Sequence, residues 1–363
     1  MRKRNANNER IKRKYLQFLR EAKQLSPKSV EQAAAAIASF EESTGWRDFA
    51  KFHVEQARKF KAQLADAVNE KTGKPLAKAT IKSRLKEVKA FFFWLASEPG
   101  YRSKLKHSDT EYFNISANDN RIASAHREMP VPTLEQVLGV IGSMPAGSEI
   151  EMRDRAVISF ALLTGARDDA IASIPIGLVD LEKRSVFQDA RTVRTKNRKS
   201  FTTYFFPVGD EVTAIVADWI DYLTRQKGYG PDDPLFPATE IALNENGLFH
   251  PSGLKRAFWS NAGAIRRIFR EAFEAAGLPY CNPHTIRKTL VRLGEQRCRT
   301  PEEFKAWSQN LGHEQVMTTF RSYGNVPGNR QGEIMARIGR RDDTNSALTP
   351  EARAALELLL KTG

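Results

Sequence analysis

The first hundred residues carry apolar side chains at helical spacing, in four segments separated by turn and capping signals. The fourth segment, near residues 77–97, has the most regular pattern. Its apolar positions are three and four residues apart, which places them on one face of a helix: Ile81, Leu85, Val88, Phe92 and Leu95. The pattern therefore predicts a small all-helical domain with helices near residues 8–24, 27–45, 50–68 and 77–97.

The helical periodicity stops near Pro99-Gly100 and resumes at Thr133. The residues between them are mostly polar and end in two prolines, which is typical of an interdomain linker. Thr133 with Gln136 three residues later has the signature of a capping box, so a second domain begins there. We predict four parts: a helical domain over residues 1–105, a linker over 106–131, a second domain over 132–340 and a C-terminal tail helix over 341–363.

The second domain mixes helical and strand-like patterns. Helical spacing recurs near residues 133–144, 152–163, 211–226 and 265–276, in a helix that carries His284 and Arg287, and in a further helix that starts at Thr300 and stops at Gly312. The β-prone segments 191–195 and 201–207 predict a hairpin with Lys196 at its tip, and a short strand is predicted over 185–188. Residues 228–252 show no regular pattern. The predicted fold class is mainly α with a small β-sheet.

Positive charge is concentrated in the first part of the chain. The net charge is +14; residues 1–131 hold 27 Lys and Arg against 15 Asp and Glu, whereas residues 132–363 hold 30 against 28. A surplus confined to one end favours a polyanion such as DNA or RNA as the partner. A basic, solvated surface without a partner is the alternative interpretation.

The predicted helix near residues 77–97 is the candidate for contacting nucleic acid. Lysines line a second face of this helix: Lys78, Lys82, Lys86 and Lys89. Such a flank can lie along phosphates, and Ser83 and Arg84 would reach base edges if the helix entered a major groove. The same pattern fits a plain amphipathic helix with a lysine-rich solvent face, and the helix alone does not decide between the two.

Several protein classes do not fit this sequence. No run of 18 apolar residues is present, and no apolar core follows the basic N-terminus, so neither a membrane-spanning helix nor a secretory signal is predicted. Cys281 and Cys298 form no CxxC pattern, which fits a reducing cytoplasm. The sequence has no Walker-type phosphate loop, no HExxH motif and no carboxylates at metal-ligand spacing, so no metal or other cofactor is predicted.

The stretch from residue 283 to residue 323 is the richest in candidate chemistry. His284 and Arg287 lie three residues apart and so share a helix face. His313 directly follows Gly312, a plausible helix stop, and Tyr323 lies ten residues further on. A tyrosine hydroxyl, with an ordinary pKa of about 10, needs positioned help to act as a nucleophile. Taken singly, each residue also has a structural interpretation, such as a packed aromatic ring or a capping histidine.

Six short motifs in this order resemble the tyrosine recombinases of the phage integrase family. TGAR resembles the first arginine motif, RTKNRKSFTTYFFP the β-hairpin lysine motif and HTIR the HxxR box, and LGH and TTFRSYG follow. The resemblance covers most of the chain, and its first half resembles a helical core-binding (SAM-like) domain. Within the lysine motif, Lys196 is the first candidate for the catalytic lysine and Lys199 is the second. The motifs supply six candidate catalytic residues: Arg167, Lys196, His284, Arg287, His313 and Tyr323.

Two features depart from the family pattern. Ala170 stands three positions after Arg167, where the family often has an acidic residue, and Asp168 or Asp169 would have to substitute for it. The tyrosine follows the last histidine at a spacing of ten positions, where nine is common. The first departure leaves open what orients the arginine.

The resemblance implies a site-specific recombinase or integrase that cleaves and rejoins DNA through a 3′-phosphotyrosine, without metal or ATP. Tyr323 would attack the phosphorus, the two arginines would hold its non-bridging oxygens, and Lys196 would protonate the leaving 5′-oxygen. His284 would assist the deprotonation of the tyrosine, and His313 would donate a hydrogen bond to the phosphate.

The implied partners are double-stranded DNA with specific recombination sites, further copies of the chain in a homotetramer on synapsed DNA, and DNA-bending accessory factors. The implied setting is the bacterial cytoplasm, at the nucleoid, on a mobile element. Two alternatives share the motifs. One is a type IB topoisomerase-like relaxase, and the other is an accessory DNA-binding protein that has lost catalysis.

Overall fold

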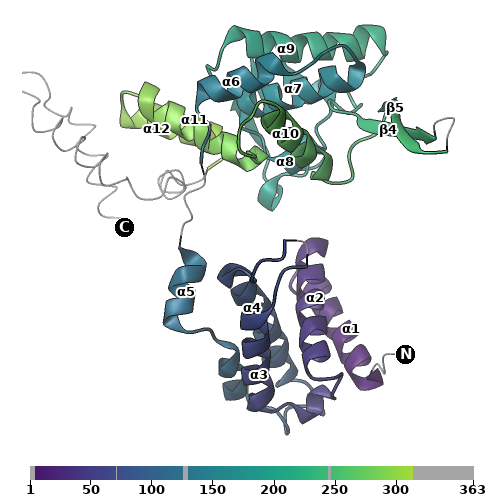
Figure 1. Cartoon of the computed structure of the whole chain (residues 1–363), viewed down its shortest axis with the longest axis vertical. Coiled ribbons are helices and arrows are strands. Elements are labelled where there is room, and N and C mark those ends of the chain that lie inside the picture. Colours follow the sequence, from purple (N-terminus) through teal and green to yellow (C-terminus); the bar gives the residue numbers. More distant parts are fainter. Residues whose placement is uncertain (1–4, 71, 126–129, 244–246, 314–363) are drawn as a thin grey trace, which may run out of the picture. The chain divides into compact units, whose positions relative to one another are not determined.

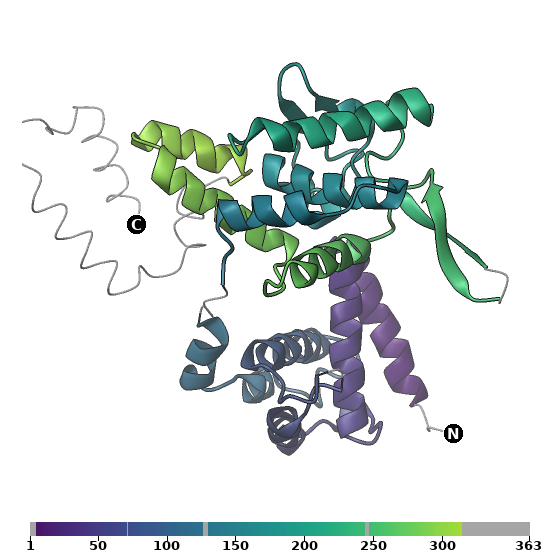
Figure 2. The same cartoon turned by 45° about the horizontal axis from the view of Figure 1, so that its top comes forward.

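A computed structural model describes residues 5–70, 72–125, 130–243 and 247–313. The chain divides into two compact units, unit 1 over Met1–Arg127 and unit 2 over Glu128–Gly363 (Figures 1 and 2). The predicted nucleophile Tyr323 and the predicted tail over 341–363 lie outside the described residues. No described helix has the length and apolar character that a membrane crossing requires.

Unit 1 is built on four main helices at the predicted positions: α1 (Ala6–Glu21), α2 (Pro27–Ser43), α3 (Val54–Asp66) and α4 (Lys78–Leu95). Ser26 caps α2 by accepting a hydrogen bond from the Ser29 amide, as its Ser-Pro start predicts. The core between the helices is largely aromatic, and Phe40 meets Phe92 edge to face at 5.1 Å between ring centroids. This packing confirms a helical first unit.

The stretch expected to be a linker differs from that expectation. It forms a 3₁₀ segment, η2 (His107–Phe113), and a short helix, α5 (Ala117–Ser124). Phe113 is 1% exposed, and its ring lies 5.5 Å from that of Phe92. Burying an aromatic side chain offsets the cost of ordering the polar residues around it. The division between the units therefore falls after Arg127, not at residue 105.

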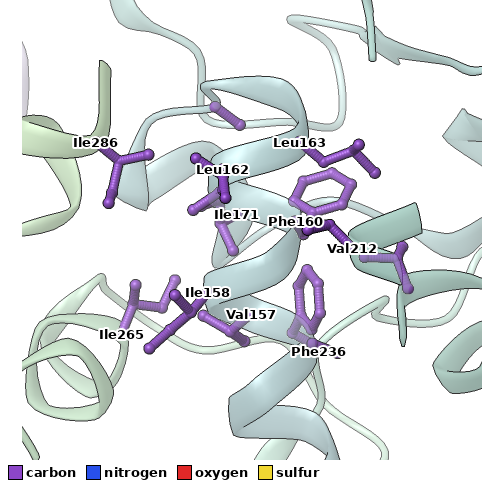
Figure 3. Packing of buried hydrophobic residues seen from close by; sticks show 14 of the residues in the cluster. Val157, Ile158, Phe160, Leu162, Leu163, Ile171, Val212, Phe236, Ile265 and Ile286 are labelled. Carbon is purple, nitrogen blue, oxygen red and sulfur yellow. The ribbon is translucent and has the colours of Figure 1, made fainter. Parts of the chain in front are cut away.

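Unit 2 is built around α7 (Glu149–Thr164), in which every residue from Ala156 to Thr164 is buried. Figure 3 shows Val157, Ile158 and Phe160 of this helix facing side chains from several other elements. A helical segment that is buried on every face belongs at the centre of a domain, and the charged first turns of α7 lead into this segment. Five of the described helices contact it: α6 (Leu134–Ser143), α8 (Asp168–Ile171), α9 (Asp210–Asp221, continued by the π-helix Tyr222–Gln226), α10 (Gly263–Ala275) and α11 (Pro283–Arg297). The last described helix, α12 (Pro301–Asn310), packs against α11.

The first sheet has the antiparallel order β1 (Val179–Asp180), β2 (Ser185–Gln188) and β3 (Phe201–Tyr204). The prediction of a strand over 191–195 was wrong, because β3 pairs with β2, with Gln188 opposite Phe201. Val193 is buried in the core of unit 2, so this segment plugs the core and does not pair with a strand. Lys196 therefore lies in a twelve-residue loop between β2 and β3, at the 3₁₀ turn η4 (Lys196–Arg198).

A second hairpin, β4 (Ala238–Leu243) and β5 (Phe249–Lys255), occupies the region expected to be irregular. Figure 1 shows it projecting from the helices of unit 2. Pro251 and Gly253 in β5 weakened the strand pattern, and the pairing register shifts between Glu240 and Ile241. A proline is tolerated in such a two-stranded ribbon because the outer edge of the strand needs no hydrogen-bond donor.

Candidate active site

Arg167 lies at the junction of α7 and α8. Gly165 ends α7 with φ of 61°, and an added Cβ there would lie 2.8 Å from Leu311 Cδ2. Glycine is therefore required both for the left-handed bend and for the close approach. The Arg167 side chain is half-buried and makes no hydrogen bond to any described residue. Burial lowers its pKa from 12.5, and the guanidinium stays charged at neutral pH.

Arg287 projects from α11 into the centre of the site and is 4% exposed. Its Nη1 donates to the carbonyl of Gly165, and its Nη2 donates to the carbonyl of Leu311 at 2.5 Å. The Nε hydrogen is buried without a partner among the described residues. Burial, then the charge of Arg167, lowers the pKa of Arg287 to about 9, so it remains a cation at pH 7. Arg287 thus joins the end of α7 to the end of α12.

His313 follows the turn at Gly312, whose φ is 69°. Its Nε2 lies 3.0 Å from Arg287 Nη2. Because a guanidinium can only donate, Nε2 is the acceptor, the ring is neutral and its proton is on Nδ1. Burial, followed by the charges of Arg287 and Arg167, lowers the pKa of His313 to about 4, in agreement with a neutral ring. Nδ1 is therefore the donor that His313 can offer.

His284 stands one turn before Arg287 on α11, whose N-terminus is capped by the Asn282 side chain. The residue is exposed, on the face shared with Arg287 that the three-residue spacing predicts. Although the residue is exposed as a whole, desolvation of its ring, followed by the charges of Arg287 and Arg167, lowers the pKa of His284 below 6.5. The ring is therefore neutral at pH 7 and can accept a proton.

Lys196 is exposed and forms no ion pair with any described carboxylate. Its charge acts on His313, where it is one of the causes of the lowered pKa, so the β2–β3 loop brings this lysine near the histidine. Lys199, the second candidate, lies in the same loop and is half-buried. Five of the six candidates, Arg167, Lys196, His284, Arg287 and His313, thus lie in one electrostatically coupled group.

The acidic residues beside Arg167 do not hold it. Ala170 is buried at 1% exposure, and Asp168 accepts a hydrogen bond of 2.7 Å from Arg266 Nε instead. The Asp169 carboxylate makes no hydrogen bond to Arg167. Asp168 or Asp169 was expected to substitute for the missing acidic residue, but Asp168 is hydrogen-bonded to Arg266 of α10 and neither carboxylate contacts the Arg167 guanidinium. The Arg167 guanidinium therefore pairs with no described carboxylate.

Unit 2 thus gathers two guanidinium groups, an ammonium group and two neutral histidines, with no carboxylate paired to any of the three cations in the described part of the chain. Such a set favours an anion with several oxygens. Among the described residues, no group of three or more His, Cys, Asp or Glu lies close enough to hold a metal ion. The carbonyls that hold Arg287 were not predicted, because a backbone acceptor leaves no signal in the sequence.

Comparison with known proteins agrees with this arrangement. The model of the Phage integrase family matches residues 133–329, more than half of the chain. The chain belongs to the phage integrase family. Tyrosine recombinase XerC of Escherichia coli is 25% identical over 310 residues, which cover 84% of this chain and 88% of XerC. The chain is therefore a tyrosine-type site-specific recombinase that acts on DNA.

Solved structures of integrases share the fold at low sequence identity. A lambda integrase dimer bound to a COC′ core site is 14% identical, with a TM-score of 0.59 over 93% of this chain and 79% of that one. The Tn1549 transposon integrase in complex with transposon right end DNA is 16% identical, with a TM-score of 0.58 over 91% and 99%. These structures confirm the mainly helical fold with its α+β integrase domain.

The lysine flank of α4 is less open than the sequence suggested. Lys78 pairs with Asp119 at 2.8 Å, Lys82 donates to Ser124 Oγ at 3.0 Å, and the third pair joins Lys89 to Glu111 at 2.8 Å. The η2–α5 segment thus occupies three of the four predicted lysines. The remaining predicted contacts are Lys86 and Ser83, which are exposed, and Arg84, which is half-buried and lines a groove with α1 and α2.

Proposed function

We propose that this integrase-family recombinase cleaves a DNA phosphodiester with Tyr323 and forms a 3′-phosphotyrosine, releasing a 5′-hydroxyl. The observation that carries the proposal is the gathering of Arg167, Lys196 and Arg287 beside two neutral histidines, with no carboxylate to neutralise them. A phosphodiester supplies the missing anion. Tyr323 lies within the family match over residues 133–329, ten positions after His313.

The chemistry assigns a role to each group. Arg167 has a free guanidinium to hold the non-bridging oxygens. Arg287 adds its positive charge to the site and holds the ends of α7 and α12 together. His313, with its proton on Nδ1, donates to the phosphate. His284, neutral at pH 7, takes or orients the proton of the tyrosine hydroxyl. Lys196 gives a proton to the leaving 5′-oxygen. The bond between the tyrosine oxygen and phosphorus forms as the bond between phosphorus and the 5′-oxygen breaks.

The phosphotyrosine keeps the energy of the broken ester, so the 5′-hydroxyl of a second strand can reverse the step on a new partner. This exchange consumes neither ATP nor a metal ion, because the side-chain cations stabilise the developing charge. We further propose that the substrate is double-stranded DNA with specific sites, synapsed by a homotetramer in the bacterial cytoplasm. The leucine-rich tail over 341–363 would dock on a neighbouring copy.

The test is covalent trapping on a nicked duplex, from which the released strand diffuses away before rejoining can occur. With EDTA present and ATP absent, we expect a protein–DNA adduct at full yield. Peptide mapping should place the adduct on Tyr323, linked to a 3′-phosphate. An adduct that requires added magnesium, or that maps to a different residue, would contradict the proposal.

DNA affinity should depend steeply on salt, and Lys86 should account for part of that dependence. A protein that contacts 6–10 phosphates loses roughly 10³–10⁵ in affinity between 50 and 200 mM salt. Lys86→Ala should reduce the slope of log K against log salt by about 0.9, because one phosphate contact is lost. Lys89→Ala is the matched control on the same helix. Its ammonium already pairs with Glu111, so its slope should change less.

Fluorescence anisotropy on a labelled duplex, repeated at several salt concentrations, gives both slopes. Equal slopes for the two variants would mean that the η2–α5 segment does not occupy the lysine flank when DNA is bound. A flat salt response of the unsubstituted protein would show that the basic unit 1 does not contact the DNA phosphates.

A further inference from the structure

We infer that Ser173, Arg194 and the backbone carbonyl of Trp259 form a clamp that sets the position of Lys196. These are positioning residues: none of them need touch the DNA, and each would act through the lysine. The inference rests on the proposed role of Lys196 as the proton donor to the leaving oxygen. Ser173 and Trp259 lie outside the motifs of the sequence analysis. Arg194 is the first residue of the lysine motif, where no role was assigned to it.

Ser173 ties the lysine loop to the turn that carries Arg167. Its hydroxyl, 4% exposed as a residue, accepts a hydrogen bond from the Arg194 amide at 2.9 Å. The same hydroxyl donates to the carbonyl of Asp169 at 2.9 Å, two residues after Arg167 in α8. One buried oxygen thus sets the distance between two segments that carry candidate catalytic cations.

Arg194 makes a second attachment with its side chain. Its Nη2 donates to the carbonyl of Trp259 at 2.9 Å, across 65 positions of the sequence. Trp259 is itself held, because the buried guanidinium of Arg153 lies 5.1 Å from its ring centroid. Arg153 also donates to the carbonyl of Pro237 at 3.0 Å, at the base of β4. The acceptor for Arg194 is therefore fixed to the core helix α7.

The clamp sets the orientation of the turn that follows it, which contains Lys196. Asn197 and Arg198 follow the lysine with φ of 59° and 51°, left-handed values that non-glycine residues rarely adopt. Two such residues in succession turn the chain sharply at Lys196–Arg198. A small shift of residues 193–194, which lead into this turn, would therefore displace the Lys196 side chain. Val193, buried in the core, and Arg194 are the last anchored residues before Lys196. Loosening Arg194 should therefore misplace the ammonium without unfolding the loop.

A sulfur leaving group separates misplacement of the proton donor from general damage. In a substrate whose 5′-bridging oxygen is replaced by sulfur, the thiolate departs without a proton, because a thiol has an ordinary pKa of about 8.5. With the oxygen substrate, Arg194→Ala should slow single-turnover cleavage about 10²-fold, the cost of a displacement on the order of 1 Å. With the sulfur substrate, its rate should return close to that of the unsubstituted protein.

Three variants complete the design. Lys196→Ala is the reference and should show the same rescue by sulfur. Ser173→Ala, which changes no charge, should give a smaller defect that sulfur also rescues. Arg191→Ala removes an exposed arginine of the same loop, paired with Asp189, and should cleave both substrates normally. Thermal melting and DNA affinity, measured on every variant, show that the fold and the binding are retained.

The outcomes distinguish the two levels of the proposal. If sulfur does not rescue Lys196→Ala, the proposed role of Lys196 fails. If sulfur rescues Lys196→Ala but not Arg194→Ala, the lysine keeps its role and the clamp is refuted. If Arg194→Ala cleaves the oxygen substrate at the normal rate, the clamp is also refuted.

Discussion

Tyr323→Phe is expected to abolish the covalent protein–DNA adduct while leaving DNA affinity unchanged. The substitution removes one oxygen, and that oxygen is the proposed nucleophile. The candidate cations Arg167, Lys196 and Arg287 all remain, so the phosphodiester is still held. Without an attacking group, the stabilisation of the transition state by those cations has nothing to act on. Adduct formation should fall below detection on the nicked duplex.

Tyr204→Phe is the matched control for this loss. Tyr204 lies in β3 of the same unit and is 62% exposed. It does not follow the LGH turn, and its removal should leave adduct yield intact. Gel-shift titration and denaturing electrophoresis of the same samples give affinity and adduct yield. An adduct that persists in Tyr323→Phe, or disappears in Tyr204→Phe, would show that a different side chain attacks.

Arg287→Ala is expected to cost both catalysis and stability. Loss of a group that stabilises the charge developing in the transition state slows the chemical step about 10²–10³-fold, by analogy with an oxyanion-hole donor. The same change leaves the buried carbonyls of Gly165 and Leu311 without their donor, and each such group costs about 1–3 kcal/mol. The melting temperature of unit 2 should fall by several degrees, because a domain of this size loses about 2–4 °C for each kcal/mol.

Arg167→Ala separates the two effects. Arg167 is half-buried and makes no hydrogen bond to a described residue, so its loss should slow cleavage about as much with little change in melting temperature. Calorimetry and single-turnover cleavage on both variants provide the comparison. Equal melting temperatures for the two variants would show that the carbonyl contacts of Arg287 do not stabilise the fold. Normal cleavage by Arg167→Ala would remove it from the phosphate clamp.

Local signals in the sequence were reliable where neighbouring residues carry the physics. Thr133 caps α6, with its hydroxyl accepting from the Gln136 amide at 3.2 Å, and Thr300 caps α12 in the same way with Glu303 at 3.1 Å. The capping box at Thr133 was predicted from residue type and spacing alone, and the start of α12 has the same residue pattern. A cap needs only the side chain and the amides of the next turn, so no distant part of the fold can overrule it.

Strand pairing was predicted less well. The segment 191–195 has β-formers at the right spacing, yet the partner of β3 is β2, and Val193 enters the core instead. The hairpin β4–β5 was missed because Pro251 and Gly253 interrupt its pattern. A strand makes its ladder hydrogen bonds with neighbouring strands and not within itself, so its existence is a property of the pair and not of either segment.

The chain's own short-range pattern specified the helix starts, the basic first unit, and the order of the six candidate catalytic residues. These depend on side-chain type and on contacts within one or two helical turns. Folding over long distances settled how those residues are held: Arg287 on two carbonyls from other elements, Asp168 on Arg266, and the lysine loop on Ser173 and Trp259. A hydrogen bond to a distant backbone carbonyl does not depend on the type of residue that supplies the carbonyl, so no sequence pattern predicts it. A pair of distant side chains, such as Arg266 and Asp168, is set by the fold that brings them together.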